Sequence, residues 1–264
     1  MTLVRFFPLL FLALAGCGPG AGEIREGYVE GNFVTVAAPE AGWVDQLAVV
    51  EGDQVSPGTL LFALEATREQ AARNAAAANV KAAEARLTLA IQNLARQEAL
   101  AQTSASARKD LDAARSEREA AAAGVETARS DLTRAEWQFD QRRVTARVAG
   151  RIEDVVRHKG DYVAAGGAVI LMLPPENVKL RFFVPETMLA SLQRGGKVSV
   201  ECDGCPDEMT ATIGFVSSDA EFTPPFIFSV GNREKLVFLV EARPDGEAGK
   251  ALRPGLPVAV RLKP

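Results

Sequence analysis

The sequence predicts a multidomain α+β protein in which a small β-sandwich is split by an inserted antiparallel coiled-coil α-hairpin and is followed by a small β-barrel. The first observation is a repeat, because residues 38–58 and 146–166 carry one β motif twice and align without a gap. The second is the Ala-rich, helix-forming segment between the copies, which must leave and return at the same place. The third is a series of alternating apolar segments after Pro174.

The composition fits a folded protein of more than one domain, because the chain has 264 residues with ordinary apolar and charged fractions. Its formal net charge is −4, so no basic field favours nucleic-acid binding. A single His and the lack of a Gly-rich phosphate loop leave little for catalysis. We therefore expect no enzyme activity, no cofactor and no metal site.

The N-terminal segment has the form of a secretory signal. Residues 1–16 place one positive residue before an apolar run that is too short to span a bilayer as a stable helix. The residues before Cys17 then resemble a bacterial lipobox, in which the Cys is acylated and becomes the first mature residue: Leu14, Ala15 and Gly16. An ordinary signal with a chance Cys is the alternative. Lipidation at Cys17 would hold the mature chain on a membrane in an envelope space.

Each copy of the repeat alternates small apolar and polar residues, which predicts short strands with one buried face. Turn glycines and aspartates are expected at Gly42, Gly52, Asp53 and Gly58 and, in the second copy, at Gly150, Gly160, Asp161 and Gly166. This pattern resembles the biotinyl/lipoyl domain, a flattened β-sandwich with internal two-fold symmetry. Carrier members attach their cofactor to a Lys between the halves, whereas here the first Lys after Glu65 is Lys81, inside the insert. The resemblance implies a lipoyl-like sandwich over residues 38–65 and 143–173, and the missing Lys opposes an acyl- or biotin-carrier role.

The insert, residues 66–142, has no Pro and a single Gly, Gly124. Its apolar residues recur at steps of three and four, interrupted by Gln97 in the first arm and by Arg118 in the second, which predicts one narrow stripe on each arm of a coiled coil. The stripe of the first arm is Ala76, Val80, Ala83, Leu87, Ala90, Leu94 and Ala101, and that of the second is Leu111, Ala114, Ala121, Val125, Ala128, Leu132, Ala135 and Phe139. Turn and N-cap residues at 102–106 predict the break, with Ser106 as the N-cap of the second arm. The alternative, two helices in a globular core, conflicts with the dense charge on the outer faces.

The C-terminal region, residues 174–264, is predicted to be a small β-barrel or sandwich. Strands are expected at 198–202, 210–216, 236–242 and 258–262, with a short helix within 185–193. Residues 17–37 are interpreted as lipid anchor, linker and a strand near 31–37. The apolar loop at 222–228 either packs under the barrel or faces a partner.

The pair Cys202 and Cys205 is expected to form a local disulfide that closes a hairpin, because an envelope space is oxidising. Lipidation of Cys17 would leave only these two thiols, so that pairing would be complete. A zinc site needs about four ligands, and a thioredoxin-like motif needs a helix N-terminus. The sequence around the pair offers neither.

This order of segments resembles the HlyD-type periplasmic adaptor, or membrane fusion, proteins, and residues 213–217 and 220–224 are similar to the single-hairpin lipoprotein subgroup that accompanies ABC-type exporters. The resemblance implies a periplasmic scaffold, lipid-anchored to the inner membrane of a Gram-negative bacterium, that assembles as a homo-oligomer, commonly a hexamer. It implies an inner-membrane transporter, of the ABC type, at the barrel end and a TolC-like outer-membrane channel at the hairpin tip.

The resemblance also suggests which tip residues dock the channel. The family motif is Arg, then Leu four residues on, then Ser seven residues after that, and Arg96 and Leu100 match its first two positions. Ala107 occupies the third position, with Ser106 one residue early, which puts the serine contact in doubt. The remaining candidates in the tip are Thr103 and Ser104. The alternative function is a self-associating structural envelope lipoprotein without a transporter.

Overall fold

The structure is a computed structural model, and it describes residues 23–101, 108–203, 205, 209–222, 236–246 and 252–262. The chain divides into two compact units. One is Asn32–Asn177, and the other combines Met1–Gly31 with Val178–Pro264. Cys17, the tip residues Thr103, Ser104, Ser106 and Ala107, and most of the apolar loop lie outside the described residues.

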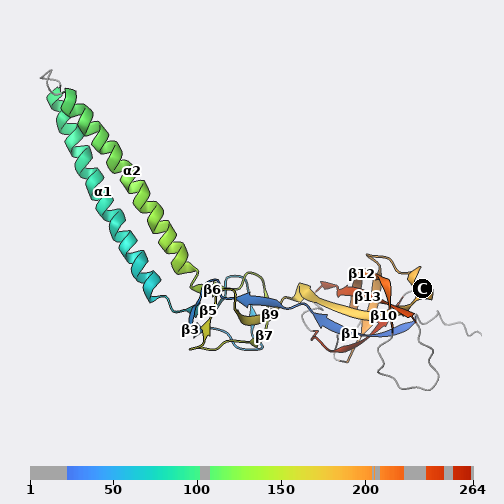
Figure 1. The fold of residues 1–264 in the computed structure, drawn as a ribbon. Helices are drawn as coiled ribbons and strands as arrows, with labels where there is room; N and C mark the ends of the chain where they lie inside the picture. The colour runs from blue at the N-terminus through green and yellow to red at the C-terminus, as the bar shows by residue number, and fades with distance from the viewer. Residues whose placement is uncertain are drawn as a thin grey trace, which may run out of the picture. The chain divides into compact units, whose positions relative to one another are not determined.

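The first unit contains a sandwich of two four-stranded sheets, shown in Figure 1. One sheet has the order β2 (Val34–Ala37), β9 (Ala168–Leu173), β7 (Gly150–Val155) and β4 (Gln54–Val55). The other has the order β6 (Arg143–Thr145), β5 (Leu60–Leu64), β3 (Gly42–Leu47) and β8 (Tyr162–Val163). A single apolar core fills the space between them, and its largest fully buried side chains are Phe62, Leu61, Ile152, Ile170 and Met172.

The two copies of the repeat contact each other reciprocally. Gly52 N–H donates to the Ile152 carbonyl at 2.8 Å, and Gly160 N–H donates to the Val44 carbonyl at 2.8 Å. These two bonds exchange equivalent residues of the repeat, because Gly52 aligns with Gly160 and Val44 with Ile152. Each half therefore completes the other, and neither half closes the core by itself.

The turns of the two copies also share one geometry. Asp53 Oδ2 accepts a hydrogen bond from Val50 N–H at 2.9 Å, and the equivalent Asp161 Oδ2 accepts one from His158 N–H at 2.9 Å. Gly52 beside the first turn has φ 91°, a left-handed conformation that an L side chain rarely adopts. The same backbone requirement explains glycine at 58, 160 and 166, all with positive φ.

Gly42 and Gly150 are not turn residues, contrary to the expectation from the repeat. They begin strands β3 and β7 and have no positive φ in the structure. Their reason for being glycine is close packing instead. A Cβ on Gly42 would lie 2.9 Å from Arg142 Nη1, and one on Gly150 would lie 2.9 Å from Met172 Cγ.

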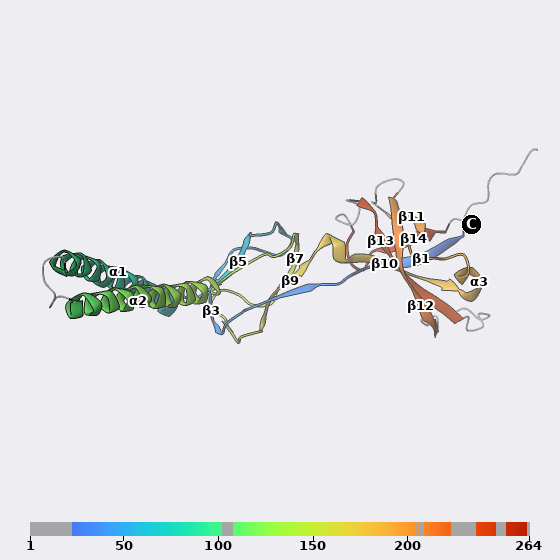
Figure 2. The ribbon, with the colours of Figure 1, turned by 90° about the horizontal axis from the view of Figure 1, so that it is seen from above.

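The insert forms α1 (Thr67–Ala101) and α2 (Arg108–Asp140), which lie side by side in both views (Figure 1, Figure 2). They are antiparallel, because Arg73 packs on Phe139 while Glu84, further along α1, pairs with Arg129, earlier in α2. The predicted stripe lies in the seam between them, where the most buried residues are Ala83, Ala90, Ala114, Val125 and Ala135. The chain leaves from β5 and returns into β6, and these two strands pair with each other.

The second unit is a closed barrel, with strands in the order β1 (Ile24–Gly31), β10 (Val178–Pro185), β13 (Leu236–Pro244), β12 (Met209–Phe222), β11 (Lys197–Glu201) and β14 (Pro257–Arg261). Alternate residues of β10 point inward and bury Leu180, Phe182 and Val184 completely. Helix α3 (Glu186–Leu189) is shorter than the predicted segment, and η2 (Pro175–Asn177) precedes β10.

Strand β1 corrects the interpretation of residues 17–37 as anchor, linker and one strand. Ile24–Gly31 pairs with both β10 and β14 and closes the barrel, while β2 belongs to the sandwich. This strand was not predicted from the sequence, because most of its side chains are polar or charged. Only Val29 is fully buried.

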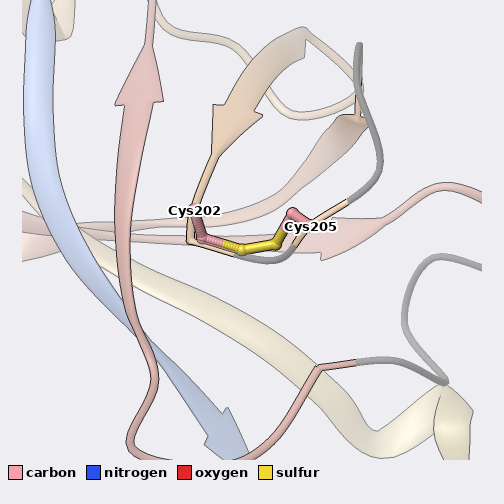
Figure 3. Close-up of a disulfide and its surroundings, with 2 residues drawn as sticks. All are labelled: Cys202 and Cys205. Carbon is pink, nitrogen blue, oxygen red and sulfur yellow. A yellow bond between two sulfur atoms is a disulfide. The ribbon is translucent and has the colours of Figure 1, made fainter.

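Cys202 and Cys205 form a disulfide in the loop between β11 and β12 (Figure 3). Their Cα atoms are 5.3 Å apart, inside the usual range for a disulfide. Cys205 N–H also donates to the Cys202 carbonyl at 3.1 Å, so the bridge spans a single tight turn.

Reduction of this disulfide is expected to lower the stability of the barrel only modestly. A loop this short constrains the unfolded chain by about 2 kcal/mol at most in the chain-entropy model. Thermal unfolding with and without a thiol reductant measures the effect. The Cys202→Ser/Cys205→Ser double variant should unfold at the same temperature in both conditions, and a global loss of the barrel on reduction would contradict the expectation.

Candidate functional site

The outer part of α1 carries the two described residues of the predicted docking motif. Arg96 and Leu100 are four residues apart and lie on one face of the helix. The Leu100 side chain is 55% exposed, and Arg96 is also exposed. Arg96 Nη2 lies 3.5 Å from Asn93 Oδ1, a weak contact that leaves the guanidinium largely in solvent.

A groove runs along the same face between the two helices. Its volume is about 540 Å³, and it is lined on α1 by Arg86, Leu89, Asn93 and Arg96 and on α2 by Glu117, Ala120, Ala121 and Gly124, with Ala83 and Ala90 between them. Leu89 is 62% exposed at its edge. The groove is therefore continuous with the predicted docking face, because Arg96 belongs to both.

Small residues on α2 create this groove. Ala120, Ala121 and Gly124 present almost no side chain along one side of the seam. A Cβ on Gly124 would meet no atom within 4 Å, so nothing in the described chain requires glycine there. A glycine inside a helix costs about 1 kcal/mol relative to alanine, and close packing among the described residues gives no reason to bear this cost.

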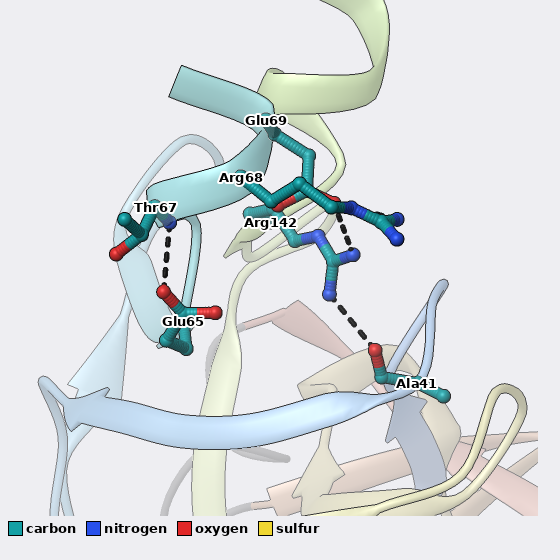
Figure 4. A network of polar contacts seen from close by, with 6 residues as sticks. All are labelled: Ala41, Glu65, Thr67, Arg68, Glu69 and Arg142. Carbon is teal, nitrogen blue, oxygen red and sulfur yellow. Dashed lines mark hydrogen bonds and ion pairs between the residues drawn. The ribbon is translucent and has the colours of Figure 1, made fainter. Parts of the chain in front are cut away.

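At the other end of the hairpin, a buried ion pair ties both helices to the sandwich (Figure 4). Arg142, two residues after α2, donates from Nη2 to Glu69 Oε1 in the first turn of α1 at 2.6 Å. Its Nη1 donates to the Ala41 carbonyl, just before β3, at 2.8 Å. Both charged side chains are about nine-tenths buried. One guanidinium thus joins the start of α1, the end of α2 and the sandwich.

The environment of Glu69 keeps its carboxyl ionised. Burial raises its pKa, but the hydrogen bond from its own backbone amide and the contacts with Arg142 outweigh burial and hold the pKa below the usual value. Glu65 adds a second anchor, because its carboxylate accepts the Thr67 N–H at 2.8 Å at the first residue of α1 (Figure 4). The contacts with Thr67 lower the Glu65 pKa.

Sequence reasoning missed this junction. Glu69 and Arg142 are 73 residues apart and look like ordinary surface charges at the ends of an Ala-rich insert. The one available signal was Gly42, since the glycine lets Arg142 approach the backbone beside it.

The described part of the chain offers neither a membrane-crossing helix nor a metal cluster. Among the helices that the structure describes, none has the length and apolar character needed to span a bilayer. In that same part of the chain, no three His, Cys, Asp or Glu side chains gather as metal ligands would.

Comparison with known proteins gives partial sequence matches. The UPF0194 membrane protein in the asrC 5′ region of Acidithiobacillus ferridurans is 31% identical over 179 residues, which cover 67% of this chain and 51% of that protein. The multidrug resistance protein MdtA of Erwinia amylovora is 30% identical over 175 residues, which cover 64% of this chain and 43% of that protein. No protein-family model matches the chain.

A solved structure matches over much more of the chain. The membrane fusion protein Spr0693 from Streptococcus pneumoniae R6 has a TM-score of 0.55 and 25% sequence identity, and the match covers 91% of this chain and 98% of that one. The chain is thus similar to a membrane fusion protein over most of its length and to a multidrug resistance protein over part of it. The chain spans about half the length of the two curated relatives named above.

Proposed function

We propose that the chain is the periplasmic adaptor subunit of a tripartite efflux or secretion system. In this role it links an inner-membrane transporter, of the ABC type, to a TolC-like outer-membrane channel. It works as a scaffold rather than as a catalyst, in several copies that form a homo-oligomer, a hexamer in the proposed assembly. Cys17 carries the lipid that anchors it to the inner membrane of a Gram-negative bacterium.

The observation that supports the proposal best is how the hairpin is connected to the sandwich. Two helices of 35 and 33 residues leave one sandwich and return to it through paired strands. At about 1.5 Å per residue they form an arm of roughly 50 Å. The buried Arg142–Glu69 pair fixes the base of this arm. Such an arm suits end-on contact with a distant helical partner, and a lipid anchor would raise the local concentration of the chain at its transporter.

The similarity to membrane fusion proteins supports the same role. It extends over both units of the chain in the structural comparison, and MdtA is a multidrug resistance protein. A self-associating envelope lipoprotein is the competing function, and it predicts no contact with a transporter or a channel.

Crosslinking in intact cells tests the proposal. Single cysteines replace Thr103 in the tip and Phe226 in the apolar loop, both in a background without Cys202 and Cys205. We expect the Thr103 position to capture an outer-membrane channel and the Phe226 position an ABC transporter. A cysteine at the exposed Ala75, near the base of α1, is the matched control and should capture neither. Crosslinks solely between copies of this chain would overturn the proposal and favour the competing function.

A further inference from the structure

We propose that one rim of the barrel rests in the headgroup region of a lipid bilayer, with the paired ends of β12 and β13 as its apolar contact. This rim, which we call the anchor rim, includes the start of β1 (Ile24), the end of β10 (Pro185), the end of β12 (Phe222) and the start of β13 (Leu236). The inference deepens the proposed function, on which it rests because it takes Cys17 as the lipidated residue. It assigns the bilayer itself as the partner of this rim.

The directions of the strands bring these four ends together. β1 pairs antiparallel with β10, β10 with β13, and β13 with β12. In an antiparallel pair, the start of one strand lies beside the end of its neighbour. The register agrees, because Pro185 lies opposite Val237 across β10 and β13. Phe222 likewise lies opposite Leu236 across β12 and β13.

The proposed lipid anchor is a short length of chain away from the anchor rim. Ile24, the first residue of β1, comes seven residues after Cys17. Even a fully extended chain spans no more than about 3.6 Å per residue, so Ile24 lies within about 25 Å of the bilayer surface that holds the acyl chains. Every later residue of β1 is further from Cys17 along the chain, so the anchor rim is the part of the barrel that reaches the bilayer most readily.

The paired ends of β12 and β13 are apolar at the anchor rim. Their last three residue pairs contain one charged residue, Glu221, and the other members are Ala220, Phe222, Leu236, Val237 and Phe238. Val237 lies on the outer face of β13, because the inward-facing Val240 and Ala242 are completely buried and successive residues of a strand point to opposite faces. Ile24, at the start of β1, adds an apolar side chain that is 50% exposed. Exposed apolar residues gathered at one place mark a surface for a membrane or a protein.

The other end of β13 is polar instead. Arg243 is exposed there. Asp245, just after the strand, accepts hydrogen bonds from the hydroxyls of Thr210 at 2.8 Å and Thr212 at 2.6 Å. β13 therefore changes from apolar at the anchor rim to charged at its far end, as a strand does when one of its ends meets lipid and the other meets water.

The two cations beside Ile24 are already paired with carboxylates. Arg25, the next residue, pairs with Glu23. Arg261, which lies opposite Ile24 in the register of β14, pairs with Glu201 at 2.7 Å. Paired cations give little attraction for anionic lipids, so the contact depends on the apolar residues of the rim. We therefore expect it to form on a neutral bilayer.

Fluorescence quenching by labelled lipids tests the inference. The full-length lipidated chain, without Cys202 and Cys205, carries Val237→Cys labelled with a dye and is reconstituted into phosphatidylcholine vesicles that hold no other protein. We expect spin labels on the lipid headgroups to quench this dye at least threefold more strongly than a dye at Arg243→Cys. Arg243 is the matched control, because it lies on the same face of the same strand, six residues or about 20 Å away. Equal quenching at the two positions would overturn the inference.

A second position makes the test independent of any affinity of the dye for lipid. The dye is moved to Ile24→Cys, and Val237→Asp is added in the same chain. Val237 is partly exposed, so the barrel should stay folded, and the unfolding temperature checks this. Quenching at position 24 should fall at least threefold with Val237→Asp and stay unchanged with Arg243→Asp. Unchanged quenching with a folded Val237→Asp chain would refute the contact through β12 and β13.

The vesicles hold no transporter and no channel, so their result is separate from the crosslinking in cells. Mass spectrometry of Cys17 checks the shared premise, and an unacylated Cys17 would remove the lipid anchor and this inference together. With Cys17 acylated, a dye at Val237 that stays in water on the vesicles but is shielded by an added transporter would refute the lipid contact and leave the proposed function intact. Strong quenching at Val237, from a chain that captures no transporter in cells, would keep the inference and remove the proposed function.

Discussion

The variant Leu100→Asp is expected to abolish export while leaving folding and lipidation intact. Leu100 is an exposed apolar side chain, four residues from Arg96, on the face of α1 that leads to the tip. A buried Leu in a docking contact contributes about 2 kcal/mol, and an Asp in its place adds the cost of an unpaired charge. The measurement is substrate accumulation in cells that carry the variant as their sole copy, with the amount of lipidated chain followed in parallel.

Ala99→Asp is the matched control for this experiment. Ala99 is exposed beside Leu100 but turned about 100° around the helix. Ala99→Asp loses slightly more helix propensity than Leu100→Asp, because Ala is the better helix former, so the control is the stricter of the two. We expect Ala99→Asp to export normally. Normal export by Leu100→Asp would remove the tip-docking idea, and an equal loss from both variants would show that the defect lies in the helix rather than in a contact.

The parts of the fold that were predicted correctly are those with strong local rules. The Gly-Asp pairs at Gly52 and Gly160 predicted turns, and in the structure both glycines have a positive φ. The repeat predicted that the two halves belong to one domain. The helical stripe was predicted because Ala83, Ala90 and Val125 recur at steps that place them in one seam, where the structure buries them. Turn residues and helical periodicity can be recognised in a single sequence, because they depend only on residues close together in the chain.

The parts that were missed depend on partners far away in the chain. Strand β1 has few apolar residues, and its place is fixed by pairing with β10 and β14, which sequence spacing does not reveal. Gly42 was read as a turn residue, whereas its role is to let Arg142 approach. The groove could not be predicted from the sequence either, because it forms where small residues on α2 lie opposite Leu89 on α1.

The Arg142→Met variant is expected to destabilise the unit Asn32–Asn177 by about 3 kcal/mol, because the buried carboxylate of Glu69 then keeps only the exposed side chain of Arg68 as an ionic partner. Arg142 also donates to the Ala41 carbonyl, so the loss loosens the hairpin from the sandwich as well as weakening each part. Urea unfolding followed by circular dichroism measures the change. The exposed Arg134, which pairs with Asp131 on the surface of α2, is the control, and Arg134→Met should cost less than about 1 kcal/mol.

The double variant Glu69→Leu/Arg142→Met distinguishes an unpaired charge from lost packing. Removing both partners leaves no buried charge, so much of the stability should return. The dependence on pH gives a second readout. The pKa of Glu69 is lowered in the folded chain, so the pair stabilises the fold fully above the unfolded-state value near 4.5 and loses this effect as the pH falls through the lower folded-state pKa. The stability difference between wild type and the double variant should therefore shift against wild type in acid. A double variant as unstable as Arg142→Met, with no such dependence on pH, would mean that Arg142 acts through its contact with Ala41 and not through Glu69.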